Sequence, residues 1–236
     1  MAIDEPGSGV PTPTLTLSRS LTFAWLAAAA IAAVVVPILI GATWPVLTFV
    51  WLAIAAVVVR RSGTPSSLGL VRIPGRRFIR VTVGATVAMT LLFGTAEALT
   101  HPYRELLALI AEESSPDSTF AWVIDHGRGW GLVGFTVYGA LVTIFAEEIV
   151  FRGALMTRLR HRGPWVAVGG TTVAFAVVQA LPAALLSVGA ALGFLVIDAI
   201  LAVGVIGGLA AYRTRSIFPA LVAVTVANVV VLAAVA

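Results

Sequence analysis

The chain has 236 residues, of which 59% are hydrophobic and only 11% are charged, and its mean hydropathy is +1.03. Because soluble domains carry about a quarter charged residues, this composition excludes an ordinary soluble protein and indicates an integral membrane protein. The chain contains no cysteine, which excludes disulfides, iron–sulfur clusters, thiolate zinc sites and cysteine nucleophiles. The formal charge of +4 comes from arginines that flank apolar stretches, so it indicates membrane topology and argues against nucleic-acid binding.

The first 20 residues, MAIDEPGSGVPTPTLTLSRS, are rich in Pro, Thr, Ser and Gly, a composition typical of disorder. We expect residues 1–20 to form a disordered cytoplasmic tail and residues 21–236 to form one transmembrane helical domain. A signal peptide is not expected, because the extreme N-terminus has no positive charge and the apolar run starts late. All fifteen basic residues are arginine, which favours a bacterial source and hence the inner (plasma) membrane of a bacterium.

Long apolar stretches define the expected fold. A helix needs about 20 mainly apolar residues to cross a bilayer. The sequence therefore predicts an all-α, polytopic membrane bundle of about seven transmembrane helices, with six or eight as alternatives. The predicted spans are residues 22–41, 43–59, 81–99, 130–151, 165–186, 189–211 and 216–236.

The arginines orient this bundle. With a cytoplasmic N-terminus, thirteen of the fifteen arginines fall on the inner side, and only Arg104 and Arg128 fall outside. Such a bias is the positive-inside pattern, and it predicts an N-in, C-out topology. The outer loop 100–129 contains YRELLALIAEE (103–113), whose apolar residues share one helical face. That pattern predicts a short helix at the membrane surface.

Two adjacent glutamates end the fourth predicted span, in the segment FAEEIVFR (145–152). Glu148 and Arg152 are four residues apart, in the order that favours an ion pair on a helix. Glu147 points about 100° away from Glu148 and is the freer carboxylate. The segment can be a general base beside a carboxylate held by an arginine, or a helix end anchored by a salt bridge.

Four stretches resemble a known family. AEEIVFRGAL resembles the EExxxR motif of the CAAX-processing and bacteriocin-processing endopeptidases, and FAVVQ (175–179) falls where that family has FxxxH. RTRSIFPALVAVTVAN (213–228) resembles RTGSxxPAxxxHxxxN, and SLGLVR (67–72) resembles the segment after the family's early spans. The resemblance covers about residues 65–230. It implies a membrane fold with a glutamate-centred intramembrane protease site.

This chain departs from the family at both histidines. In the family, the first glutamate and the FxxxH histidine are thought to activate water, and the later histidine and asparagine to hold the oxyanion. Glutamine and valine occupy the two histidine positions here. The motif-equivalent positions of this chain are Glu147, Glu148, Arg152, Gln179, Val224 and Asn228.

The two replacements remove the chemistry that the family uses. Gln179 cannot take up a proton near pH 7, and Val224 can neither donate nor accept a hydrogen bond. Losing one oxyanion donor costs about 10²–10³ in rate, and a missing proton-transfer partner costs about 10²–10⁴ more. We therefore expect no active catalytic residue. Glu147, Glu148 and Arg152 are expected to form a buried polar cluster, with Gln179 and Asn228 as plausible partners.

No cofactor is expected either, and no metal site is predicted, since the sequence has no HExxH motif. Asp198 lies alone in the middle of an apolar span, GFLVIDAILAVG. An intramembrane carboxylate marks a functional site by default. Asp198 can be a proton or cation site, a contact to an arginine of a partner, or a neutral group hydrogen-bonded inside the bundle.

Three functions compete. The first is a non-catalytic, protease-like membrane protein that serves as a binding or accessory subunit of a larger membrane assembly, such as a transporter complex. It explains both the retained carboxylates and the lost histidines, and its partners are other membrane proteins of unknown identity. The second is an active, glutamate-dependent intramembrane endopeptidase, which needs a replacement base. The third is a small transporter, which explains Asp198 but lacks internal repeats.

The arginine distribution makes a topology prediction that reporter fusions can test. Fusions at residue 70 and residue 160 should report the cytoplasm, and a fusion at residue 115 should report the exterior. An external signal at residue 70 would overturn the orientation.

Overall fold

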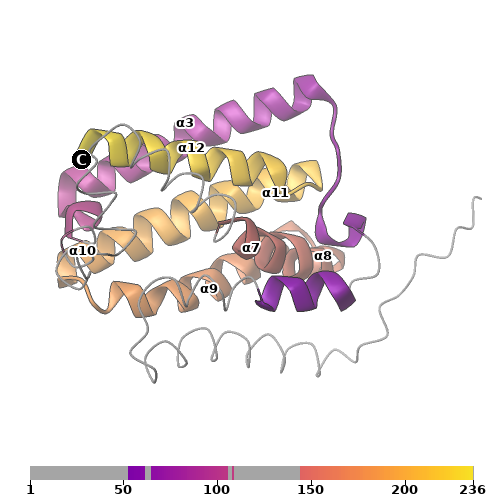
Figure 1. The fold of residues 1–236 in the computed structure, drawn as a ribbon, viewed down its shortest axis with the longest axis horizontal. Helices are drawn as coiled ribbons and strands as arrows, with labels where there is room; N and C mark the ends of the chain where they lie inside the picture. The colour runs from indigo at the N-terminus through magenta and orange to yellow at the C-terminus, as the bar shows by residue number, and fades with distance from the viewer. Residues whose placement is uncertain (1–52, 62–64, 106–107, 109–143, 236) are drawn as a thin grey trace, which may run out of the picture.

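The computed structural model describes residues 53–61, 65–105, 108 and 144–235 (Figure 1). Within these residues the regular elements are all helices, which confirms the all-α prediction. The tail 1–20, the span 22–41 and most of the spans 43–59 and 130–151 lie outside the described residues. The number of spans and their orientation therefore stay predictions.

Four long helical segments form the described bundle. Three of them are long and apolar enough to cross a membrane, and the fourth, α12, is a shorter apolar helix. The bounds are α3 Gly75–Thr100, α9 Pro164–Ala183, the continuous segment Val188–Thr214, and α12 Phe218–Val235. The predicted spans 81–99, 165–186, 189–211 and 216–236 each fall on one of these segments.

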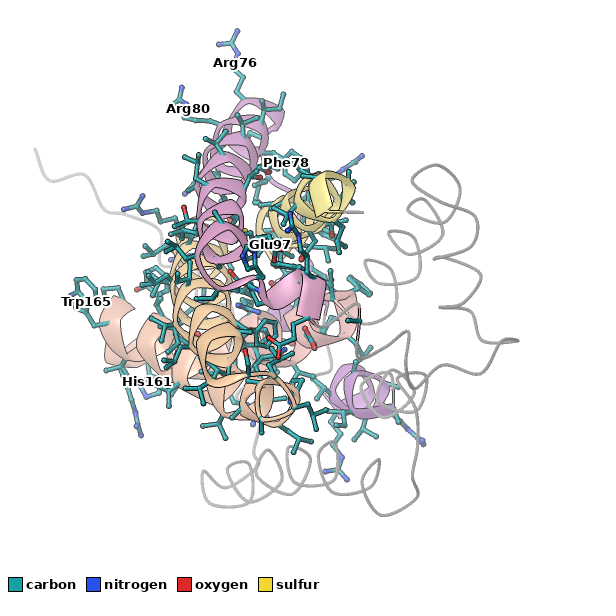
Figure 2. The ribbon with its side chains drawn as sticks, turned by 90° about the vertical axis from the view of Figure 1, so that its left-hand side faces the viewer. Arg76, Phe78, Arg80, Glu97, His161 and Trp165 are labelled. Carbon is teal, nitrogen blue, oxygen red and sulfur yellow. The ribbon has the colours of Figure 1, made fainter. Side chains whose placement is uncertain are left out.

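The boundaries differ from the predictions for local reasons. Helix α3 begins six residues earlier than predicted, at Gly75 directly after Pro74, because arginine side chains in its first turns can extend to solvent while their stems cover apolar surface. Figure 2 shows Arg76 and Arg80 pointing away from the bundle, whereas Glu97 lies among the helices. Ser187 separates α9 from the next segment, where its hydroxyl caps α10 by accepting from the Ala190 N–H.

Two stretches of the bundle are π-helical. The segment Val188–Thr214 consists of α10 (Val188–Leu192), the π-helix η5 (Gly193–Gly207) and α11 (Gly208–Thr214). The segment with the two glutamates consists of α7 (Phe145–Glu148), the π-helix η3 (Ile149–Leu155) and α8 (Met156–Leu159). Two short 3₁₀ turns adjoin this second segment. The turn η1 (Pro65–Leu68) packs against η3 in space, and η4 (Arg160–Arg162) follows α8 in the sequence. π-Helical turns are rare and are frequent at functional sites.

The π-helix η5 is the centre of the bundle. It packs against α3 on one side and α9 on the other, and α12 packs along α3 (Figure 1). Small residues allow these close contacts: Gly193 faces Thr100 of α3, and Gly204 faces Thr172 of α9. Gly208 faces Val168 of α9, whereas Gly189 faces open space. Gly193, Gly204 and Gly208 therefore serve packing within the bundle, whereas Gly189 does not.

The turn between α11 and α12 is built by the RTRSIFP sequence. Arg215 has a left-handed backbone conformation (φ 55°) that ends α11. The Thr214 hydroxyl donates to the carbonyl of Ala210, and it accepts from the N–H of Ser216 at 3.3 Å. These bonds satisfy polar groups that a helix end leaves without partners.

The same turn is bound to the loop that precedes α3. The Ile217 N–H donates to the carbonyl of Gly69 at 3.0 Å, and the Ser216 hydroxyl donates to the carbonyl of Val71 at 2.8 Å. Gly69 has φ +68°, a conformation that glycine adopts without strain. The two family-like stretches SLGLVR and RTRSIFPA thus contact each other directly.

Arginines from two other elements bind the end of α11. The Arg160 guanidinium donates to the carbonyls of Ala211 and Tyr212 at 3.0 and 3.1 Å, and Arg77 donates to the carbonyl of Arg213. Positive charge is favourable at a helix C-terminus, where carbonyl groups lack partners. The beginning of α3, the turn η4 and the end of α11 therefore bring arginines together at one end of the bundle.

A close backbone contact gives the first structural prediction. A Cβ at Gly153 would lie 2.5 Å from the Leu68 carbonyl oxygen, whereas a Cβ at Gly84 would meet nothing within 4 Å. Overpacking of this kind costs about 1–3 kcal/mol. Gly153→Ala should therefore lower the thermal unfolding temperature in detergent.

The matched control is Gly84→Ala on the exposed side of α3, which should leave stability unchanged or raise it slightly, because alanine favours helix. Equal unfolding temperatures for the two variants would contradict the contact between η3 and Leu68.

Candidate functional site

An ion pair lies at the centre of the EExxxR segment. Arg152 Nη1 lies 2.9 Å from Glu148 Oε1, and the side chains of Arg152 and Glu148 are 1% and 2% exposed. The pair predicted from the i, i+4 spacing is therefore confirmed. Its burial is stronger than a helix end at the membrane surface would give, and ions buried to this degree need close partners.

Arg152 also links its helix to two others. Its Nη2 donates to the carbonyl of Val203 in η5 at 2.6 Å. The guanidinium lies 4.9 Å from the centre of the Phe175 ring of α9, within the range of a cation–π interaction. Phe175 in turn packs edge-on against Phe151, with ring centres 5.4 Å apart. One side chain thus joins η3, η5 and α9.

The two arginine contacts show how these helices run. Arg152 binds Val203 and Arg160 binds Ala211, and both pairs are separated by 51 positions in the sequence. The two segments therefore run parallel and in register. Arg152 lies eight residues before Arg160, so helical rise places it about 12 Å from the arginine-rich end of the bundle. The ion pair lies deep in the bundle.

Two buried polar atoms of the ion pair lack a hydrogen-bond partner. Among the described residues, neither Glu148 Oε2 nor Arg152 Nε has a hydrogen-bond partner, although both atoms are buried. Glu147 is half-buried, and its carboxylate lies within electrostatic range of Arg152 and Glu148. The freer carboxylate of the pair is thus Glu147, as the helical geometry predicted.

The structure does not join the two expected partners to the glutamates. Gln179 is half-buried on α9, and in the described part of the chain its side chain makes no hydrogen bond with Glu147 or Glu148. Val224 is 4% exposed on α12. Asn228 faces a different group: its Nδ2 donates to the Val224 carbonyl at 2.9 Å, and its Oδ1 accepts from the Tyr103 hydroxyl at 3.2 Å. The expected partnership of Gln179 and Asn228 with the glutamates is therefore corrected.

Tyr103 is a residue that sequence reasoning missed. The predicted surface helix 103–113 begins with it, yet Tyr103 is only 8% exposed and packs against Phe93 with ring centres 6.0 Å apart. Helix α3 ends where His101 adopts a left-handed conformation, φ 52°. That turn directs the following residues back over the bundle. Residues 106–107 and 109–113 lie outside the described part of the chain.

Glu97 fixes this turn. Its Oε2 accepts from the Tyr103 N–H at 2.9 Å, and its Oε1 lies 3.3 Å from Arg104 Nε. A carboxylate at the start of a short helix satisfies an N–H that has no helical partner. The salt bridge to Arg104 provides the opposite charge. Glu97 therefore has a structural role that holds Tyr103 against α12.

Asp198 lies near the same group of side chains. It is 3% exposed on η5, within electrostatic range of Glu97 and Tyr103. Neither of its carboxylate oxygens makes a hydrogen bond of standard geometry with a described residue. No group of three or more His, Asp or Glu side chains in the described ranges could hold a metal ion.

The described residues thus place a buried glutamate–arginine pair inside a bundle that contains three apolar helices of membrane-spanning length. A family model described as type II CAAX prenyl endopeptidase Rce1-like matches residues 129–230. This match supports the resemblance of residues 129–230 to the CAAX-processing and bacteriocin-processing endopeptidase family that the motifs indicated. Comparisons with curated proteins and with solved structures gave no significant match.

The matched segment contains the motif-equivalent positions from Glu147 to Asn228, and it also contains Asp198. Glu97 and Tyr103 precede it. The contact between Tyr103 and Asn228 therefore attaches a segment outside the matched domain to the asparagine of the last motif. No motif signalled this contact.

The buried ion pair predicts a large effect on stability. Removing one partner of a buried pair costs about 3–5 kcal/mol, because it leaves the other charge unpaired. Arg152→Met should therefore lower the folded yield and the thermal unfolding temperature strongly. Arg162→Met, at an exposed position of η4, is the matched control and should behave like the wild type.

Glu147 provides a contrast in the same experiment. It has no ion pair of its own among the described contacts, so Glu147→Gln should preserve stability. Wild-type stability of Arg152→Met would contradict a structural role for the ion pair.

Proposed function

We propose that this protein is a non-catalytic CAAX-protease-like membrane protein that acts as a binding or accessory subunit of a larger membrane assembly. A transporter complex is a candidate for that assembly, because such complexes are large and embedded in lipid. The observation that carries the proposal is the pair of replacements at the motif histidines, Gln179 and Val224. The family match concerns the protease-like domain, and the accessory role is our inference.

The chemistry of the site supports this proposal. Activation of water by Glu147 needs a proton-transfer partner, and glutamine cannot take up a proton near pH 7. An oxyanion needs preorganised donors, and valine supplies none. Asn228 is the remaining motif donor, and its amide already donates to the Val224 carbonyl and accepts from Tyr103. The motif positions thus contain carboxylates without the groups that complete a hydrolytic site.

The retained charges support it as well. Arg152 contacts Glu148, Val203 and Phe175, which come from three packed segments. Loss of this side chain would leave Glu148 without its counter-ion and would remove the hydrogen bond to the Val203 carbonyl. Selection for a stable fold therefore suffices to explain why EExxxR persists after loss of the histidines.

One observation favours the alternative of an active, glutamate-dependent endopeptidase. Glu147 is half-buried, and no described hydrogen bond occupies its carboxylate. A carboxylate in this state can serve as a general base for a bound water. This alternative requires an oxyanion donor from a residue other than Val224.

An activity assay separates the two functions. We expect the purified protein in lipid to cleave neither prenylated CAAX peptides nor leader-peptide substrates above the background given by Glu147→Gln, because both histidine functions are missing. Cleavage that disappears in Glu147→Gln would make the endopeptidase the primary function. Gain of cleavage in the double variant Gln179→His with Val224→His would show that these two losses silence the site.

The accessory role is tested on the same protein in native membranes. Copurification and mass spectrometry should recover a membrane partner in a fixed ratio, and Glu147→Gln should recover the same partner. Purification of the chain alone, in wild type and variant, would contradict the accessory role.

A further inference from the structure

Exposed arginines gather where α3 begins and α11 ends. Arg76, Arg77 and Arg80 lie in the first turns of α3, and Arg213 and Arg215 lie at the end of α11, and all five are exposed. The Arg77 guanidinium donates to the Arg213 carbonyl, so the first turn of α3 lies against the end of α11. We call these five residues the arginine cluster.

The described part of the chain offers the arginine cluster no carboxylate. Its carboxylates are Glu97 and Glu105, at and beyond the opposite end of α3, and Glu147, Glu148 and Asp198, within the bundle. Like charges that lie together repel each other. An anion from outside the described chain would therefore offset the repulsion within the cluster.

The length of α3 places the arginine cluster at the level of lipid headgroups. With 26 residues the helix is about 39 Å long, whereas the hydrocarbon core of a bilayer is about 30 Å thick and is crossed by about 20 residues. About six residues of α3 therefore project beyond the core. Because charged side chains are costly in hydrocarbon, the projecting turns are the first ones, which contain Arg76, Arg77 and Arg80.

The face of α3 that bears two of these arginines continues as an apolar stripe. Helical geometry places Arg76, Arg80, Val83, Val87 and Leu91 within about 80° of each other around the helix axis. The three apolar side chains are 53%, 55% and 67% exposed. On a helix of membrane-spanning length, such a stripe faces acyl chains. A lipid on this face therefore meets apolar side chains with its acyl chains and arginines with its headgroup.

A tryptophan marks the membrane surface at the same end of the bundle. Trp165 lies in the first turn of α9, is 86% exposed and points away from the helices (Figure 2). Its helix packs against α11, and Arg160, just before it, binds the carbonyls of Ala211 and Tyr212. Tryptophan is enriched where membrane meets water. Trp165 thus supports this position of the headgroups independently of the arginines.

We propose that the arginine cluster is a binding site for the headgroup of an anionic phospholipid. The guanidinium groups of Arg76 and Arg80 donate to the phosphate oxygens, a geometry that arginine suits well, while the acyl chains lie along the apolar stripe of α3. Because the cluster carries uncompensated positive charge, it favours a lipid with net negative charge over a zwitterionic one. This site is separate from the glutamate pair and does not depend on the accessory function.

Native mass spectrometry of the full chain in neutral detergent tests the proposal. The protein is offered phosphatidylglycerol and phosphatidylcholine with identical acyl chains, and we expect it to retain phosphatidylglycerol in preference. An arginine near an anionic lipid surface contributes about fivefold in affinity, so Arg76→Gln should reduce the preference about fivefold and Arg76→Gln/Arg80→Gln about 25-fold. Arg76→Lys/Arg80→Lys, which keeps both charges, should retain most of it.

The matched control is Arg104→Gln, which removes an arginine beyond the opposite end of α3 and should keep the preference. Loss of preference in Arg104→Gln equal to that in Arg76→Gln would overturn the proposal, because net charge would then decide. Equal retention of the two lipids by the wild type would overturn it whatever the variants do. Displacement of phosphatidylglycerol by excess inorganic phosphate would also overturn it and would indicate a site for free phosphate.

Discussion

The packing of the described helices depends on the ion pair between Glu148 and Arg152, which is buried inside an apolar bundle. Glu148 and Arg152 are almost fully buried, and the guanidinium makes two further contacts at the same depth. Its Nη2 donates to the Val203 carbonyl of η5, and its charge lies over the Phe175 ring of α9. Because an unpaired ion at this depth is costly, the three segments must pack in one register. The matching contact of Arg160 with Ala211 keeps that register to the end of α11.

Some residues of the family-like motifs hold the fold together, and others occupy positions that carry out the chemistry in the family. Ser216 and Ile217 bind the loop at Gly69 and Val71, and Gly153 packs closely on Leu68, so three motif segments meet at one end of the bundle. These contacts need no histidine. The chemical part has lost its proton-transfer and oxyanion groups at Gln179 and Val224. A protein-binding role would need only the structural part, and this division supports the accessory function that we propose.

Sequence patterns predicted the features that depend on local spacing. Apolar length placed the long helices, and the i, i+4 spacing gave the Glu148–Arg152 pair, since both follow from helical geometry. The hydrogen bond from Arg152 to the Val203 carbonyl could not be predicted, because every residue carries a backbone carbonyl. The π-helix that contains Val203 could not be predicted either, because π-helices have no clear sequence pattern. The apolar pattern of residues 103–113 predicts that Tyr103 lies at the membrane surface. Its burial results from the turn at His101 and the Glu97 contact, which are tertiary features.

The most direct test of the central claim compares Arg152→Met with the double variant Glu148→Leu/Arg152→Met by thermal unfolding in detergent. If the pair is structural, removing both charges should restore part of the stability that the single change loses, since no unpaired ion remains. Recovery should be partial, because Val203 and Phe175 still lose their contacts with the guanidinium. A double variant that is no more stable than Arg152→Met would contradict this account of the EExxxR segment.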